Sequence, residues 1–448
     1  MRRRRLSTTL LASIGVFALV GCGLDSESPG DDSNGDAGED QTESASGSEE
    51  LSGEITFTTL QLSPDFDDYL QGVIDDFEGQ HEDVTVNWVD LPFEGAAERL
   101  LADASAGELA DVINLNPDLA YPLASDGQFI NLDEAAADVR GDYIEGAWDS
   151  FRYPEQDGAY GFPWYLTTET TMYNTSILEE AGLDPDSPPE TYEELFEMGM
   201  SVGSETDVNA IHPALEDRLV IDLRKRGVEI ANEDLTEATF NTQQAIDHVT
   251  ALRDLHEAGG ISSDAVTQEH RHEIDAYQAG QLATFMRGPN FINIVAENAP
   301  DVAEVTVPGP QIKGEAEMTG MSVMGLFVPE STDNPDLALE FAAFMTNGEN
   351  QIRFAEETPV FPSIEAALQD DSFLPDEDDD SAVAEATRIA AEQLPEAENI
   401  RPVYVDEEVN QALIQNVQGA ILGQLSPEEA LDAAEDEVNQ IFERRSDR

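Results

Sequence analysis

The fold of this chain is decided by the stretch Ala159-Tyr-Gly-Phe-Pro-Trp-Tyr-Leu-Thr-Thr-Glu-Thr-Thr-Met-Tyr-Asn174. Five aromatic rings fall within fourteen residues of this stretch, whereas aromatic residues make up only 7% of the whole chain. The β-branched run Thr167–Tyr173 predicts a strand. Ile177–Ala181 predicts a short helix that ends at Gly182, and a further helix is expected to begin at Thr191. A strand rich in aromatic rings that passes between two folded parts would suit a flat ligand that stacks on rings.

Toward the N-terminus of this stretch, predicted strands alternate with predicted helices. Strands are expected at 55–60, 84–89 and 111–115, and helices at 65–78, 94–106 and 116–123. The alternation indicates βαβ units and a largely parallel sheet. In such sheets ligands bind beyond the carboxyl ends of the strands. The loops 61–66, 90–94 and 114–118 are therefore expected at one edge.

Toward the C-terminus the pattern is mainly helical. Helices are expected at 190–203, 241–258, 272–279, 334–345 and 409–423, with a last helix from Ser426, and short strands are expected at 282–286, 302–307 and 321–328.

Length and charge limit the classes of protein to consider. A chain of 448 residues is too long for one ordinary core, so two lobes are expected. The net charge is −74, and Lys225 and Lys313 are the only lysines. Such a surface repels the phosphates of nucleic acids, which excludes nucleic acid as a partner. It also repels itself unless salt screens it, so we expect adaptation to high salt; an ordinary acidic protein with an acidic linker is the alternative.

The N-terminal segment predicts export and a lipid anchor. Arg2–Arg5 form a basic region, and an apolar region follows at Leu10–Val20 that is too short for a comfortable membrane span. The sequence Leu19-Val-Gly-Cys22 resembles a bacterial lipobox, in which Cys22 is acylated; a plain signal peptide with an incidental cysteine is the alternative. Because Cys22 is the only cysteine, no intrachain disulfide is possible. The residues that follow, to about Glu50, are acidic and small and predict a disordered tether.

Motifs that would indicate catalysis or metal binding are weak. Glu269–Glu273 contains two histidines and two glutamates, but histidines two residues apart do not share a helix face, so a surface charge run is the better interpretation and no metal site is expected. Gly199-Met-Ser-Val-Gly203 matches the nucleophile-elbow pattern, yet it follows a helix instead of a strand. With 95 acidic residues, carboxylate pairs cannot be judged, and a glycoside hydrolase remains the rival hypothesis.

The aromatic stretch offers candidates for stacking against a sugar. Trp164 and Tyr165 are adjacent on a predicted strand, so they should point to opposite faces, one to the core and one to a cleft. We favour Trp164 for the ligand and Tyr165 next, with Phe162 and Tyr173 in the core. Polar partners for hydroxyl groups are available in the predicted loops: Asp65, Asp90, Asn114, Asn116, Arg287 and Asn290.

Several segments, in order, resemble the family 1 extracellular solute-binding proteins, the sugar-binding lipoproteins of ABC importers akin to maltose-binding protein. These segments are Tyr160-Gly-Phe-Pro-Trp164, Tyr173-Asn174, Ala181-Gly-Leu183, Pro189-Glu-Thr-Tyr-Glu-Glu-Leu195, Asp111-Val-Ile-Asn-Leu115, Ala279–Met286, Gly288-Pro289, Pro308-Gly-Pro310, Gly325–Pro329, Leu339-Glu-Phe341 with Phe344, and Gln415–Leu431. The resemblance covers residues 54 to 443, and its strength lies in the order of the segments.

The resemblance implies an α/β, two-lobed periplasmic-binding-protein-like fold, with mixed, mostly parallel sheets flanked by helices and a ligand cleft between the lobes. The implied organisation is a signal peptide at 1–21, a tether at 22–53, an N-terminal lobe at 54–165 and 306–347, and a C-terminal lobe at 166–305 and 348–448. The implied ligand-binding residues are Ser63, Asp65, Asp90, Asn114, Asn116, Trp164, Tyr165, Arg287 and Gly288. No cofactor is implied.

We therefore predict a monomeric, non-catalytic receptor, lipid-anchored through Cys22 to the outer face of the cell membrane. It would bind a mono- or oligosaccharide and present it to the permease subunits of an ABC importer. A membrane-anchored glycoside hydrolase and a lectin without a permease are the alternatives. Polyols, glycerol phosphodiesters and other solutes use the same scaffold; a phosphorylated ligand would need clustered positive charge, for which Arg287 is the obvious candidate.

Overall fold

The computed structural model describes residues 51–267, 271–370, 372–376 and 378–446. The predicted signal peptide, the lipidation of Cys22 and nearly all of the predicted tether lie outside the described residues. Part of the 269–273 charge run does so as well.

Two β-sheets organise the described chain. The larger sheet has the order β2-β1-β3-β8-β4-β9, with β10 paired to β8, and the smaller has the order β6-β5-β7. The strands are β1 (Gly53–Leu60), β2 (Val84–Leu91), β3 (Val112–Leu115), β4 (Gly161–Thr168), β5 (Thr170–Asn174), β6 (Thr284–Arg287), β7 (Thr306–Gly309), β8 (Thr319–Phe327), β9 (Phe361–Pro362) and β10 (Ala397–Glu398). We call the part built on the larger sheet the first lobe and the part built on the smaller sheet the second lobe.

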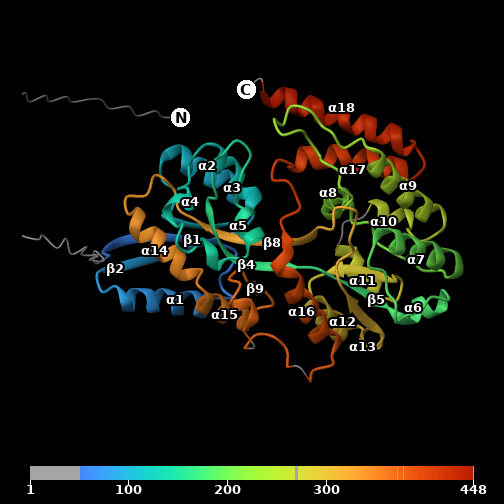
Figure 1. Cartoon of the computed structure of the whole chain (residues 1–448), viewed down its shortest axis with the longest axis horizontal. Helices are drawn as coiled ribbons and strands as arrows, with labels where there is room; N and C mark the ends of the chain where they lie inside the picture. Colours follow the sequence, from blue (N-terminus) through green and yellow to red (C-terminus); the bar gives the residue numbers. More distant parts are fainter. Residues whose placement is uncertain (1–50, 268–270, 371, 377, 447–448) are drawn as a thin grey trace, which may run out of the picture. The chain divides into compact units, whose positions relative to one another are not determined.

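Helices make up most of the remainder (Figure 1). They are α1 (Asp67–Gln80), α2 (Ala96–Ala106), α3 (Pro117–Ser125), α4 (Leu132–Ala135), α5 (Glu145–Asp149), α6 (Thr175–Glu180), α7 (Tyr192–Glu205), α8 (Leu215–Lys225), α9 (Gln243–Glu257), α10 (Ser263–Thr267), α11 (Arg271–Gln278), α12 (Phe291–Asn298), α13 (Pro300–Ala303), α14 (Pro335–Met345), α15 (Gly348–Glu357), α16 (Ala382–Gln393), α17 (Glu407–Ile421) and α18 (Pro427–Ser446). Three short 3-10 helices, η1 (Arg140–Asp142), η2 (Ala367–Gln369) and η3 (Leu394–Glu396), complete the set.

The larger sheet is mixed. β1 is parallel to both β2 and β3, as the βαβ pattern predicted. β8 then runs antiparallel to β3 and β4, and β4 runs antiparallel to β9. The smaller sheet is antiparallel throughout. The expectation of mostly parallel sheets is therefore wrong, because β8 returns from the second lobe against the direction of the first three strands.

Both faces of the larger sheet are covered by apolar side chains. Val112 and Ile113 are adjacent on β3 and fully buried, and they belong to different clusters, one on each face. The cluster that contains Val112 also holds Phe57 of β1, Phe77 of α1 and Phe341 of α14. Because both faces of the sheet are covered, every residue of the strand Val112–Leu115 is buried, including the polar Asn114.

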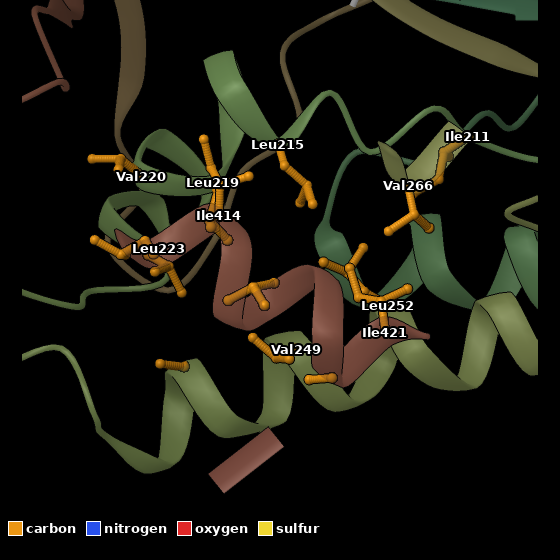
Figure 2. Close-up of a cluster of buried hydrophobic side chains, with 14 of the residues drawn as sticks. Ile211, Leu215, Leu219, Val220, Leu223, Val249, Leu252, Val266, Ile414 and Ile421 are labelled. Atoms are coloured by element: carbon orange, nitrogen blue, oxygen red, sulfur yellow. The ribbon is translucent and has the colours of Figure 1, made fainter. Parts of the chain in front are cut away.

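The core of the second lobe is largely helical. Figure 2 shows apolar side chains of α8, α9 and α17 meeting in one cluster, among them Leu219, Leu252 and Ile414. Tyr173 of β5 belongs to the same cluster, whereas its neighbour Met172 packs on the opposite face with α11 and α12. The smaller sheet is therefore also covered on both faces.

Three predicted lobe boundaries disagree with the observed packing. The sequence assigns 306–347 to the first lobe, yet β7 pairs with β5 of the smaller sheet. It assigns 348–448 to the second lobe, yet Phe354 of α15 and Ile364 pack in the first lobe's cluster. The chain crosses between the sheets later than the sequence indicated. The first crossing follows Thr168, because Leu166–Thr168 still pair with β8, and the second follows Gly309. The rest of the predicted partition stays a prediction.

Candidate ligand-binding site

A cavity of about 480 Å³ lies where the chain crosses between the two sheets. Its walls are formed by the ends of β4, β6 and β8, the first turns of α3 and α12, and the segment after β10. The lining residues are Asn116–Asp118, Thr167–Glu169, Ile221, Arg287, Gly288, Asn290, Phe291, Gln311, Gly320–Val323, Pro359 and Asn399–Arg401. Because both sheets contribute to it, movement between the lobes would change its shape.

The first lobe contributes the start of α3. Asn116 is the N-cap of this helix, and its Oδ1 accepts a hydrogen bond of 2.8 Å from the backbone N–H of Leu119. Asp118 lies in the first turn, where burial raises the pKa of its carboxyl group and the nearby Arg401 guanidinium opposes that rise. The wall therefore presents one amide and one carboxyl group at a helix N-terminus.

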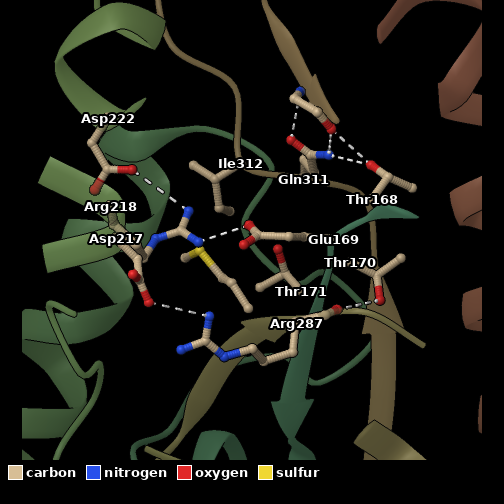
Figure 3. A network of polar contacts seen from close by, with 12 residues as sticks. Thr168, Glu169, Thr170, Thr171, Asp217, Arg218, Asp222, Arg287, Gln311 and Ile312 are labelled. Carbon is tan, nitrogen blue, oxygen red and sulfur yellow. Dashed lines mark hydrogen bonds and ion pairs between the residues drawn. The ribbon is translucent and has the colours of Figure 1, made fainter. Parts of the chain in front are cut away.

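Glu169 stands at the crossing itself, as the single residue between β4 and β5 (Figure 3). Its Oε2 lies 2.7 Å from Nη1 of Arg218, whose side chain is only 6% exposed. Burial would raise the pKa of Glu169, but Arg218, together with Lys225 and Arg287, holds it below its ordinary value. A carboxylate that stays ionised at the cavity wall can accept hydrogen bonds from ligand hydroxyl groups.

Arg218 is held in turn by α8 and α7. Its Nη2 lies 3.5 Å from Oδ1 of Asp222, which also accepts a hydrogen bond of 2.6 Å from the hydroxyl of Tyr192. The carboxylates of Glu169 and Asp222 therefore neutralise a buried guanidinium and orient it toward the crossing.

Arg287 enters the cavity from the end of β6. Its Nη2 lies 3.0 Å from Oε2 of Glu273, and its Nη1 lies 3.9 Å from Oδ2 of Asp217. Glu273 is 3% exposed, and burial raises its pKa to about 7 even though Arg287 opposes the rise. The guanidinium thus meets a protein carboxylate near each of its terminal nitrogens.

Gln311 lies between β7 and β8, where the chain returns to the larger sheet, and its side chain bonds to the end of β4, where the chain leaves that sheet. Its Nε2 donates hydrogen bonds to Oγ1 of Thr168 (2.7 Å) and to the carbonyl of Gly320 (2.6 Å), while its Oε1 accepts from the backbone N–H of Gly320 (2.9 Å). The same Oε1 accepts a hydrogen bond of 2.8 Å from Nζ of Lys225. One amide side chain at the cavity wall therefore joins β4, β8 and α8.

The structure brings three of the predicted ligand-binding residues into this cavity: Asn116, Arg287 and Gly288. Asn290, which the sequence suggested as a polar partner, also lines it.

Trp164 lies elsewhere, and its predicted role is corrected. Its side chain is fully buried in the first lobe, stacked on Phe354 with ring centroids 5.5 Å apart. The neighbouring Tyr165 is half-buried and packs edge-on against the same Phe354 ring at 5.2 Å. The register of β4 against β8 shifts between Pro163 and Tyr165, so strict alternation of faces does not hold there. Both rings consequently pack into one core cluster.

The other predicted residues do not line the cavity. Asp90 accepts hydrogen bonds from Thr59 Oγ1 (2.6 Å) and from the backbone N–H of Leu62 (3.0 Å), so it supports the loop after β1. Asn114 is fully buried and donates to the carbonyl of Gly325 at 3.3 Å. Ser63 and Asp65 are exposed on that same loop. A ligand role for these four residues stays a prediction.

Among the wall residues that sequence reasoning missed are Glu169, Phe291 and Arg401. Glu169 did carry a signal, because it is the one charged residue in a run of otherwise β-branched, aromatic and apolar residues. Phe291 follows the turn after β6 and is half-buried; of the described lining residues it is the one with an aromatic ring. Arg401 lies in a segment without regular periodicity, so no local pattern marked it.

The motifs that had suggested catalysis or metals have structural explanations. Gly199–Gly203 lies inside α7, so Ser201 is not on a strand-to-helix turn, and its Oγ donates to the carbonyl of Glu197 at 3.2 Å. Among the described residues, no group of three or more His, Cys, Asp or Glu side chains is arranged to hold a metal ion. In the same part of the chain, no helix is long and apolar enough to cross a membrane.

The chain is similar to known proteins in both sequence and structure. Residues 72–381 match the family model described as bacterial extracellular solute-binding protein. A solved periplasmic-binding protein from Synechococcus sp. MITs9220 is 30% identical, with a TM-score of 0.74, and the match covers 87% of this chain and 99% of that one.

Two curated relatives carry names that state a ligand. The arabinooligosaccharide-binding protein of Halalkalibacterium halodurans is 26% identical over 296 residues, which cover 60% of this chain and 65% of the relative. The galactooligosaccharide-binding protein of Bacillus subtilis is 22% identical over 386 residues, which cover 83% of this chain and 86% of the relative.

Proposed function

The chain belongs to the family of bacterial extracellular solute-binding proteins, and we propose that its ligand is a carbohydrate bound in the 480 Å³ cavity at the crossing of the lobes. Members of the family and the named relatives are binding proteins and not enzymes, in agreement with the expected receptor. The names of the two relatives support an oligosaccharide as the ligand.

The observation that carries this proposal is the chemistry of the cavity wall. Carboxylates of Asp118 and Glu169 can accept hydrogen bonds from hydroxyl groups, and the guanidinium of Arg287 and amide of Asn290 can donate to them. Phe291 offers one apolar ring to the flat C–H face of a sugar. A few convergent polar groups beside an aromatic ring, in a volume within the range of about 300–1,000 Å³, are typical of small-ligand sites.

A ligand screen tests the proposal. Purified protein is mixed with mono-, di- and oligosaccharides, and binding is read as a rise in melting temperature and as a change in tryptophan fluorescence. Phe291→Ala should weaken the best hit by at least tenfold, as expected for a ring that anchors a ligand. Ile294→Ala is the matched control, because Ile294 lies on the same helix, is 38% exposed and does not line the cavity.

Two outcomes would contradict the proposal. Failure of every saccharide to bind would remove the carbohydrate assignment. Equal affinities of the Phe291 and Ile294 variants would remove Phe291 from the site. The same incubation also tests the rival hydrolase hypothesis, because a receptor returns its oligosaccharide intact whereas a glycosidase shortens it.

We further propose that the protein is a monomer anchored to the outer face of the cell membrane through a lipid on Cys22 and that it delivers its ligand to an ABC permease. The lipobox-like sequence before Cys22 supports the anchor, and the family supports the importer. Cys22→Ser should release the protein from membranes into the medium. If the variant stays on the membrane after washing in high salt, the lipid is not the anchor.

Adaptation to high salt is also part of the proposal. It is supported by 95 acidic residues against 21 basic ones in the whole chain. A surface of one charge sign is destabilised by its own repulsion, which salt screens.

A further inference from the structure

We propose that Glu273 makes the cavity selective for uncharged saccharides over phosphate esters, by occupying the guanidinium group of Arg287. The inference rests on the proposed function and names the class of ligand that the same site accepts. Arg287 is the cation that the sequence indicated for a phosphorylated ligand, so its protein partners decide between the two classes.

The first step is the position of Glu273 behind the cavity wall. Glu273 lies on α11, is 3% exposed and does not line the cavity, whereas Arg287 does. Oε2 of Glu273 lies 3.0 Å from Nη2 of Arg287 without hydrogen-bond geometry, so the carboxylate neutralises this end of the guanidinium by its charge. The backbone N–H of Met286 contacts the other oxygen of Glu273 at 3.4 Å, so the carboxyl group is held at both oxygens.

The second step concerns the other end of the guanidinium. Asp217 of α8 lies 3.9 Å from Nη1 of Arg287, and Figure 3 shows this contact. Arginine recognises phosphate best when two of its N–H groups face two phosphate oxygens. Here a protein carboxylate lies near each terminal nitrogen, at 3.0 Å and 3.9 Å, so a phosphate that approached either nitrogen would meet a like charge.

The third step is the charge balance of the wall. The charged residues that line the cavity are two carboxylates, Asp118 and Glu169, and two guanidiniums, Arg287 and Arg401. Arg218 neutralises Glu169 from behind, and Glu273 does the same for Arg287. A phosphate dianion would therefore approach carboxylates without meeting a net positive field, and like charges at close range disfavour binding. Hydroxyl groups meet no such cost, because they can donate to the carboxylates and accept from the guanidiniums.

The experiment compares wild type with Glu273→Gln at about pH 8, where the carboxyl group of Glu273, with its pKa of about 7, is mostly ionised. Isothermal titration at one constant salt concentration measures the best neutral saccharide from the screen, its phosphate ester, sn-glycerol 3-phosphate and inorganic phosphate. We expect wild type to bind the saccharide at least 100-fold more tightly than the phosphate ester. We expect Glu273→Gln to reduce that ratio at least tenfold, through tighter binding of the ester.

Asp76→Asn is the matched control. It breaks the 2.8 Å ion pair between Asp76 and Arg353, which lies outside the cavity, and should leave the ratio unchanged. Should Glu273→Gln not fold, Asp217→Asn removes the other carboxylate at Arg287 from a side chain that is 43% exposed, and the ratio should fall about threefold.

Wild-type binding alone can overturn the inference, if the phosphate ester binds as tightly as the saccharide. An unchanged ratio in a folded Glu273→Gln protein would overturn it as well. These outcomes differ from failure of the proposed function, in which no saccharide binds at all.

Discussion

Lys225 provides a sharp test of the observed packing, because it is a buried amine beside neutral acceptors. Its side chain is 1% exposed at the end of α8, and its Nζ donates to Gln311 Oε1 (2.8 Å) and to the carbonyl of Ile312 (3.1 Å). No carboxylate of the described residues forms an ion pair with it within 4.0 Å. Burial lowers the pKa of Lys225 from 10.5 to about 8, with the charge of Arg218 acting in the same direction.

The magnitude follows from the difference between the two pKa values. Between about pH 8 and 10.5 the unfolded chain still binds a proton that Lys225 has released in the folded state. The free energy of unfolding therefore rises with pH across this window, by about 3 kcal/mol in total. This contribution of Lys225 to stability is complete above its unfolded pKa of 10.5, and it is lost as the pH falls through its folded pKa of about 8.

The chain suits a direct measurement because it holds only two lysines. Lysine labelled at Cε gives one NMR signal for each amine, and Lys313→Arg assigns them. Urea unfolding of wild type and Lys225→Met at about pH 7.5 and about pH 10 measures the corresponding change in the free energy of unfolding. Wild type should gain about 2 kcal/mol relative to the variant between these two values.

Lys313→Met serves as the matched control for the unfolding experiment, since Lys313 is half-buried on the segment that follows Gln311. The gain should persist in this control. A Lys225 signal that titrates at the ordinary value of 10.5, or a stability difference that does not change with pH, would refute the buried position of the amine.

Three further predictions follow from burial and charge. Trp164→Ala should lower the free energy of unfolding by about 3–5 kcal/mol, measured by urea titration, because the ring is fully buried; a stable variant that loses only ligand affinity would instead support the stacking role first assigned to it. Wild type should lose stability relative to Glu273→Gln as the pH rises from 4.5 to about 7, because the raised pKa of Glu273 lets the folded state keep a proton that the unfolded state has released; parallel pH profiles in thermal melts would exclude this. The melting temperature should rise from dilute buffer to molar potassium chloride, because salt screens the repulsion of a chain with a net charge of −74; a flat or falling profile would argue against salt adaptation.

Local signals in the sequence predicted local structure well. Thr191 was expected to begin a helix, and it is the N-cap of α7, with Glu194 closing a capping box. Gly182 was expected to end a helix, and its φ of 75° lies in the left-handed region that glycine adopts without strain. Such features depend on residues a few positions apart, so they could be predicted from the chain alone.

Helix α8 shows where local signals fail. The sequence did not predict it, because its buried face carries Arg218 and Lys225 beside apolar residues. Those charges are tolerated because Glu169, Gln311 and the carbonyl of Ile312, far away in sequence, meet them there. Asp222 of the same helix is a further partner of Arg218. A search for amphipathic helices treats Arg and Lys as exposed residues, so it does not recognise a helix that buries them. The burial of Arg218 and Lys225 becomes understandable only when their partners in the folded structure are known.

The sequence by itself determined the strands and helices that begin the first lobe, the family to which the chain belongs, and its acidic surface. Only the tertiary structure decided which aromatic ring lines the cavity and which cations are already paired. A bulge in β4 sends Trp164 and Tyr165 into one core, and the turn after β6 brings Phe291 to the cavity wall. Contacts such as Glu273 with Arg287 depend on how elements distant in sequence pack against one another, which local periodicity does not encode.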